Sequence, residues 1–145
     1  MQIEDEIREK FDLFFKKKQK NMAHALGLEF IVVSRSEMRA TMPVNENTTQ
    51  PMGILHGGAS VALAETLASV GGYLNLSDEN KIVVGLEINA NHVRPVTAGK
   101  KVTGISTPIH RGAQTQVWET RIENEDGKLV SISRCTLAVV NRRKA

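Results

Sequence analysis

One carboxylate stands alone on the most apolar stretch of the sequence. Glu65 is the only charged residue between Gly53 and Leu74, and the residues beyond Gly58 are almost all small or aliphatic. A helix that is apolar on all sides is typical of a protein interior, where a carboxylate must be paired, protonated or used for chemistry. Two explanations follow for Glu65: a structural carboxylate paired with an arginine or with backbone N–H groups, or a catalytic group.

A histidine and two glycines precede this predicted helix. Glycines such as Gly57 and Gly58 allow close approach of a ligand or another backbone, and the first N–H groups of a helix have no acceptor within the helix. Such groups can donate to an oxygen that acquires negative charge, which is the arrangement of an oxyanion hole. On spacing alone, glycines that merely permit the turn are an equally good explanation.

The spacing of these residues suggests that two chains share one site. Glu65 and Ser69 lie on roughly one side of the helix with Gly57, so Ser69 could hydrogen-bond a group held at Glu65. Gly57 and Glu65, however, are separated by about 12 Å along the helix axis. One chain cannot easily direct both groups at one atom, whereas two antiparallel helices across a twofold axis could. The sequence therefore favours an isologous dimer with two shared sites.

The segments before the central helix must bring the chain to its start. Apolar residues spaced by three and four predict an amphipathic helix from Ile3 to Asn21 that ends in a lysine-rich run. We interpret residues 16–20 as a solvated last turn in preference to a contact for a polyanion. Strands are predicted at 28–34 and 37–43, joined by a hairpin turn, and a loop at 44–51 leads into the helix.

The segments after the helix are predicted to be strands. After a polar turn at 75–81 they cover residues 82–93, 101–109, 115–123 and 129–140, with a hairpin turn at Asp126 and Gly127. Hairpin-length connections imply an antiparallel sheet. The prediction is an α+β fold in which about five to six strands curve around one central helix, forming a single domain over residues 1–145 with an accessory helix at 1–20.

Composition narrows the functional classes. With a net charge of +3 and 4% aromatic residues, the chain lacks the interleaved aromatic side chains that stack on nucleic acid bases. The single cysteine, Cys135, cannot form an internal disulfide, and the charged N-terminal sequence leads us to expect a cytoplasmic protein without a membrane segment. No metal is expected, because no histidine, cysteine and aspartate have ligand spacing. Trp118 and Cys135 are predicted to be core residues.

Three segments resemble a known enzyme family. They are ATMPV at 40–44, QPMGILHGGASVALAET at 50–66 and VGLEINANHVRP at 84–95. Together they closely resemble the hotdog-fold acyl-CoA thioesterases, in the branch of the Arthrobacter-type 4-hydroxybenzoyl-CoA and 1,4-dihydroxy-2-naphthoyl-CoA thioesterases. The likeness extends over most of the chain from about Asn21 onward, and the His-Gly-Gly motif followed by a helical glutamate is specific to this branch.

The resemblance implies hydrolysis of an acyl-CoA thioester, aryl or short to medium acyl, between the subunits of a homodimer that usually pairs into a homotetramer. No cofactor is implied, since coenzyme A is part of the substrate. By analogy, Glu65 would be the nucleophile or the general base, and the Gly57 N–H of the neighbouring chain would polarise the carbonyl. Gln50 would orient water, His56 would hold the acyl group or favour thiolate departure, and Ser69 would supply a hydroxyl.

The phosphates of coenzyme A need cationic partners at the mouth of the site. The candidates are His92, Arg94, Arg111 and Arg134, of which His92 and Arg94 rank highest because they lie in a matched segment. An alternative function is a non-catalytic module that binds acyl-CoA or an acyl carrier in the same tunnel. It predicts saturable binding without release of a thiol.

Overall fold

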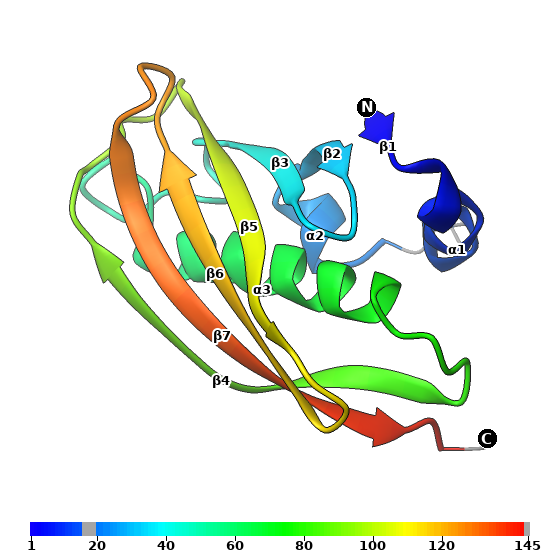
Figure 1. The fold of residues 1–145 in the computed structure, drawn as a ribbon. Coiled ribbons are helices and arrows are strands. Elements are labelled where there is room, and N and C mark those ends of the chain that lie inside the picture. The colour runs from blue at the N-terminus through cyan, green and yellow to red at the C-terminus, as the bar shows by residue number, and fades with distance from the viewer. Residues whose placement is uncertain (16–19, 144–145) are drawn as a thin grey trace.

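The computed structural model describes residues 1–15 and 20–143, and its centre is the helix α3, Gly57–Leu74. A single curved sheet wraps around this helix (Figure 1). This is the hotdog architecture that the sequence predicts, and the central helix begins two residues earlier than expected, at Gly57.

Seven strands form the sheet. In sequence order they are β1 (Gln2–Ile3), β2 (Glu29–Val33), β3 (Met38–Pro43), β4 (Lys81–His92), β5 (Lys101–Arg111), β6 (Thr115–Glu123) and β7 (Leu129–Asn141). Their order across the sheet is β1-β2-β3-β5-β6-β7-β4, and all neighbours are antiparallel except β1 and β2. The six predicted strands are confirmed to within two residues at each end, as are the hairpin turns between β2 and β3 and between β6 and β7.

The N-terminal segment differs from the prediction of one helix from Ile3 to Asn21. Ile3 lies in β1, which pairs in parallel with the end of β2, and in the described residues helix α1 is Asp5–Phe15. The side chain of Asn21 accepts a hydrogen bond from the His24 N–H (3.1 Å) and thereby caps a further short helix, α2 (Met22–Ala25). Two residues are too few to show strand alternation, and an N-cap asparagine starts a helix more readily than it ends one. The predicted lysine run at 16–19 lies outside the described residues.

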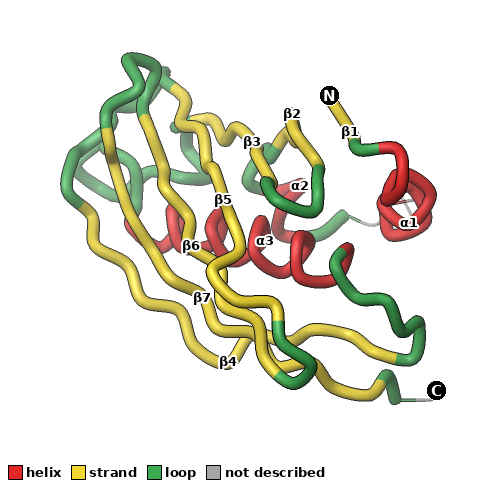
Figure 2. Tube along the Cα trace, viewed as in Figure 1, coloured by secondary structure: helices red, strands yellow, loops and turns green. Residues whose placement is uncertain are grey.

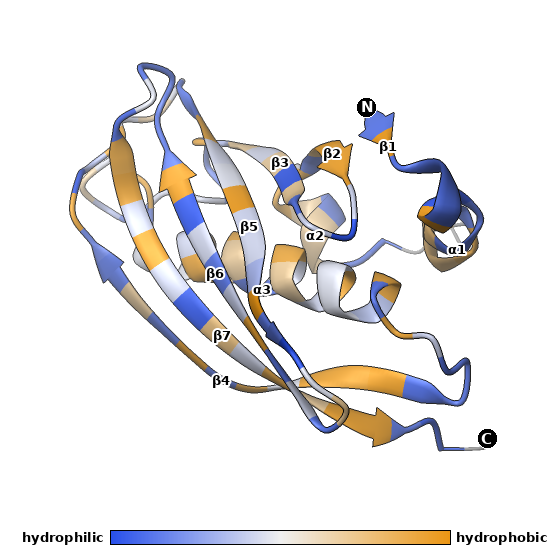
Figure 3. Ribbon diagram, viewed as in Figure 1, coloured by the Kyte–Doolittle hydropathy of each residue, from blue (hydrophilic) through white to orange (hydrophobic). Residues whose placement is uncertain are grey.

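The concave face of the sheet packs on α3. Leu63, Leu67 and Leu74 of the helix are buried, and Trp118 of β6 is completely buried beneath the helix. A Cβ atom added at Gly71 would lie 2.6 Å from the Trp118 ring, so this glycine allows the helix to approach the sheet closely. Figure 3 shows the result, because α3 is mostly white to orange along its length.

The strand β4 forms one edge of the sheet, beside β7 only (Figure 2). Its pairing with β7 is interrupted by a bulge between Gly85 and Glu87, where Leu86 is the extra residue. Val84 and Leu86 are 41% and 61% exposed. An edge strand of 12 residues with exposed apolar side chains can pair with another chain.

Candidate active site

The Glu65 side chain is half-buried on the face of α3 that approaches β4. A Cβ atom added at Gly85 would lie 2.4 Å from the Glu65 Oε1, so the carboxylate occupies space that only a glycine leaves free. Among the described residues, no ion pair or hydrogen bond involves this carboxylate. This arrangement differs from that of a structural carboxylate, which would be paired with an arginine or with backbone N–H groups.

The start of α3 is organised by His56. Its imidazole Nδ1 accepts a hydrogen bond from the Gly58 N–H (2.8 Å), and its carbonyl accepts from the N–H groups of Ala59 and Ser60. Within the described part of the chain the Gly57 N–H has no hydrogen-bond partner. In the neutral imidazole, an accepting Nδ1 leaves the proton on Nε2, from which it can be donated. His56 therefore caps the start of α3 through Nδ1 and keeps an N–H donor at Nε2.

Gly57 and Glu65 line two separate grooves of the chain. The Gly57 groove has a volume of about 370 Å³ and is lined by Gly57, Ser60, His92, Val93, Arg94 and Val130, among others. The Glu65 groove has a volume of about 560 Å³ and is lined on the α3 side by Gly58, Val61, Ala62, Glu65, Thr66, Ser69 and Val70. The structure thus brings Glu65 and Ser69 together and keeps Gly57 apart from them.

Gln50 lies in the loop between β3 and α3. This loop is tied to the helix start by a hydrogen bond from the His56 N–H to the Thr48 carbonyl (2.8 Å). The Gln50 side-chain oxygen accepts a hydrogen bond from the Met52 N–H, which leaves the amide NH₂ available as a donor. Gln50 lines neither groove of its own chain.

The four cationic candidates lie in different places. A Cβ atom added at Gly57 would lie 2.8 Å from the His92 Nε2, so His92 is directly beside the oxyanion candidate. Arg94 lines the same groove, and its guanidinium donates to the Leu129 carbonyl. Arg94 therefore provides a positive charge at the Gly57 groove, and His92 provides an imidazole beside it.

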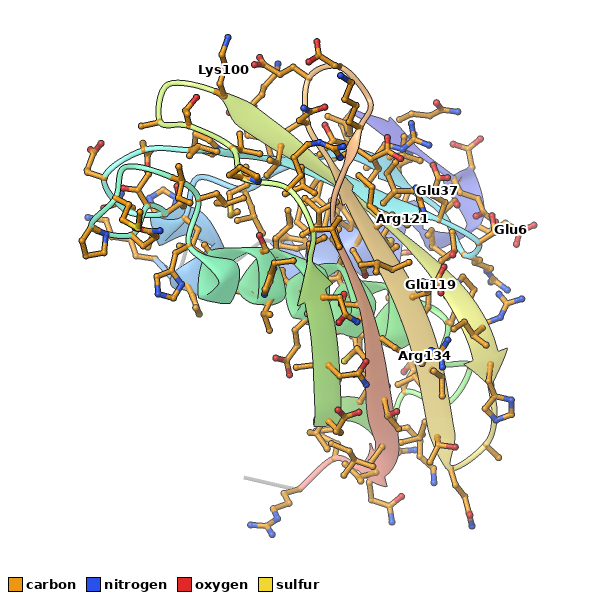
Figure 4. The ribbon with its side chains drawn as sticks, turned by 90° about the vertical axis from the view of Figure 1, so that its left-hand side faces the viewer. Glu6, Glu37, Lys100, Glu119, Arg121 and Arg134 are labelled. Carbon is orange, nitrogen blue, oxygen red and sulfur yellow. The ribbon has the colours of Figure 1, made fainter. Side chains whose placement is uncertain are left out.

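Arg111 and Arg134 are remote from this groove. The guanidinium of Arg111 donates to Asn75 Oδ1 (2.9 Å) and to the Arg35 carbonyl (3.2 Å), at the opposite end of α3. Arg134 pairs in register with Glu119 on the face of the sheet that points away from α3 (Figure 4). Its neighbour Cys135 is buried on the inner face, and adjacent residues of a strand point to opposite faces.

The two predicted core residues are confirmed. Trp118 is fully buried, and its indole N–H donates to Gln116 Oε1 (2.9 Å). Cys135 is 2% exposed, and burial, with smaller contributions from Glu65 and Glu87, raises the pKa of its thiol to about 11. A thiol with this pKa is almost entirely protonated at neutral pH and is a poor nucleophile. In the described residues, no three His, Cys, Asp or Glu side chains gather as metal ligands.

The structure adds site residues that the sequence interpretation missed. Gly85 makes room for the Glu65 carboxylate, and Phe14, Phe15 and Met22 line the Glu65 groove. An isolated glycine within a strand is a known sign of a bulge or a close approach, so Gly85 could have been found from the sequence. The contact of the N-terminal segment with α3 has no local sequence signal. No helix in the described residues is long and apolar enough to cross a membrane.

Comparisons with known proteins identify the family of this chain. The family model described as the thioesterase superfamily matches residues 52–131. The chain is 49% identical over 120 residues to the 1,4-dihydroxy-2-naphthoyl-CoA hydrolase of Escherichia coli, covering 83% of this chain and 87% of that protein. It is 48% identical over 115 residues to the proofreading thioesterase EntH of Cronobacter turicensis, covering 79% and 82% of the two chains. The crystal structure of a Haemophilus influenzae thioesterase matches with a TM-score of 0.81 and 47% identity, covering 92% of this chain and 90% of that one.

Proposed function

This chain belongs to the thioesterase superfamily and is an acyl-CoA thioester hydrolase, and we propose that Glu65 performs the hydrolysis as nucleophile or as general base. The observation that supports this role is a half-buried carboxylate without an ion pair or hydrogen bond among the described residues, on the wall of a largely apolar groove. A carboxylate with few partners keeps its lone pairs available for chemistry.

Each of the two roles of Glu65 gives a complete and balanced reaction. As a nucleophile, the Glu65 carboxylate attacks the thioester carbon, the C–S bond breaks, coenzyme A leaves as a thiolate, and water hydrolyses the resulting anhydride. As a general base, Glu65 takes a proton from a water molecule whose oxygen attacks the same carbon, and the thiolate is then protonated. Label found in the Glu65 side chain after one turnover in ¹⁸O-labelled water would establish the nucleophilic role, because only water attack on the Glu65 carbonyl of the anhydride places the label there.

The partner groups are proposed to come from a second chain. Gly57 and Glu65 line different grooves, and the free Gly57 N–H is suited to stabilise the oxyanion. The unpaired edge of β4, with exposed Val84 and Leu86, is the surface that we propose for an isologous dimer. Across that twofold axis, Gly57, His56 and Gln50 of one chain would meet Glu65 and Ser69 of the other. Further pairing into a tetramer is proposed on the family resemblance.

The proposed substrates are aromatic acyl-CoA thioesters. The support is the 49% identical relative that is named for 1,4-dihydroxy-2-naphthoyl-CoA. His92 and Arg94 are proposed to bind the phosphates of coenzyme A, because they lie together in the groove that contains Gly57. Arg111 and Arg134 remain weaker candidates, since neither lines the groove that contains Gly57. We also propose a cytoplasmic location, which fits a CoA substrate and one free thiol.

The test is hydrolysis of benzoyl-CoA and hydroxylated aryl-CoA esters, followed by release of the free thiol, for the wild type and Glu65→Ala. Losing the nucleophile or base should lower kcat by about several hundredfold or more. Glu65→Gln is the matched variant, because it keeps the shape of the side chain and removes its charge. Activity of Glu65→Ala within tenfold of the wild type would refute the assignment. Saturable binding of CoA esters without thiol release from the wild type would indicate a binding module instead.

A further inference from the structure

Five of the six aromatic residues of the chain form one contact cluster. The chain has four phenylalanines, one tyrosine and one tryptophan, and only Trp118 lies elsewhere. Ring centroids in the cluster are 4.5 to 5.7 Å apart, and its members are Phe11, Phe14, Phe15, Phe30 and Tyr73. In a chain with so few aromatic side chains, the large flat side chains are thus concentrated in one place.

The cluster has a buried base and an exposed end. Phe11 is 5% exposed and anchors α1 against the core, whereas Phe14, one turn later, is 48% exposed. Phe14 and Phe15 line the Glu65 groove, together with Met22, which is 65% exposed. Large apolar side chains left exposed beside a functional carboxylate are characteristic of a ligand contact.

The helix α1 is held in this position by contacts with the far end of α3. Phe14 packs on Tyr73 with 4.9 Å between ring centroids, and the Lys10 ammonium lies 4.7 Å from the centroid of the same tyrosine ring. Lys10 also donates a hydrogen bond to the Leu76 carbonyl (2.6 Å). These contacts fix the end of α1 beside the groove.

The facing wall of the groove consists of small side chains. Gly58, Val61 and Ala62 recur on one face of α3, and they leave the width of the groove to be set by α1 and α2. A volume of about 560 Å³ is within the range of sites for small organic ligands. The aromatic residues of α1 and the small face of α3 thus border an open slot that contains Glu65.

We propose that Phe14 and Phe15, with Met22, form the wall of the acyl site and determine which acyl groups the enzyme accepts. The inference depends on the proposed function, because it assumes that Glu65 attacks or activates water beside this slot. The wall lies outside residues 52–131, which the family model matches. A bulky planar acyl group gains contact area from this wall, whereas an acetyl group is too small to reach it.

The test compares kcat/KM for benzoyl-CoA and acetyl-CoA in the wild type and in Phe14→Ala. Removing the ring should lower the benzoyl-to-acetyl ratio about tenfold, because only the larger acyl group loses apolar contact. Phe14→Leu should recover part of the ratio. The matched control is Leu13→Ala, since Leu13 is the neighbouring residue, is 56% exposed and lines a different cavity. In this control, the benzoyl-to-acetyl ratio of kcat/KM should stay within about twofold of the wild-type ratio.

The outcomes separate this inference from the proposed function. If Phe14→Ala leaves the ratio unchanged while the wild type hydrolyses either ester, the inference is wrong and the function stands. An equal loss for both esters would likewise overturn it, because a wall that selects the acyl group acts on the larger one. Failure of the wild type to release thiol from any CoA ester would overturn both.

Discussion

At the residue scale, the backbone N–H of Gly57 is the donor that the sequence predicts for an oxyanion. Its three neighbours along the chain donate to His56, and it alone in this described turn lacks an acceptor. A partially positive helix end with one free donor is prepared to stabilise an anionic oxygen, and the donor needs no rearrangement during the reaction.

Proline at position 57 tests this N–H directly. The first position of a helix tolerates proline, and His56 already has the extended conformation (φ −72°, ψ 131°) that a residue before proline prefers. Gly57→Pro should therefore fold and lower kcat by about 10²- to 10³-fold through loss of the donor.

Gly57→Ala is the matched control for this substitution. Both variants add a Cβ atom that must displace the His92 ring, but only proline removes the N–H. Alanine should keep kcat within about tenfold of the wild type. Equal losses in the two variants would assign the effect to His92 or to packing, and not to an oxyanion donor.

The sequence alone identifies Glu65 well, because a single charge on an apolar helix is visible within about ten residues of the chain. It does not reveal that His92 contacts Gly57 or that Gly85 contacts Glu65, since both contacts join α3 to β4 across the fold. Distances of this kind depend on strand register, and a bulge such as that at Leu86 shifts the register without a strong local pattern.

At the scale of elements, a strand could be predicted when it was long enough to show alternating buried and exposed side chains. The strand over Thr115–Glu123 alternates between buried and exposed side chains and was predicted at its observed bounds. The two-residue β1 was missed, because its backbone pairing with β2 and not its side-chain pattern makes it a strand. The position of β4 beside β7 was equally invisible, because β4 precedes β5 in sequence but does not pair with it.

The edge strand β4 gives the prediction at this scale. Leu86→Lys places a charge on the exposed apolar bulge, and at a twofold interface the substituted side chains of both chains come close together. We expect the variant to become monomeric in light scattering and to lose at least about a hundredfold in kcat, because Glu65 then lacks its donor. Leu13→Lys, at an exposed position on α1, should change neither property. A fully active Leu86→Lys monomer would contradict the shared site.

At the scale of the whole molecule, a site divided between two chains can be repaired by mixing two defective chains. In a mixed dimer of Glu65→Ala and Gly57→Pro, one site receives an intact Glu65 from one chain and an intact Gly57 from the other. The second site lacks both groups. Random co-assembly should therefore restore about a quarter of the wild-type activity, since half of the dimers are mixed and each has one working site.

Each variant expressed alone provides the baseline for this experiment. If Glu65 and Gly57 of the same chain formed the site, every site in the mixture would contain one defect and activity would stay at the baseline. The activity of the mixture thus shows whether Glu65 and Gly57 of one site come from one chain or from two. The experiment works with any acyl-CoA that the wild type hydrolyses.

The close contact between α3 and Trp118 has a practical consequence for all of these variants. The only tryptophan of the chain lies beneath Gly71, and its hydrogen bond to Gln116 is extended by a bond from Gln116 to the Gly72 carbonyl (3.2 Å). Its fluorescence therefore reports whether the central helix is seated on the sheet. A blue-shifted emission retained in Leu86→Lys or Gly57→Pro would show that a chain without activity has kept its core, so the protein contains its own optical probe of folding.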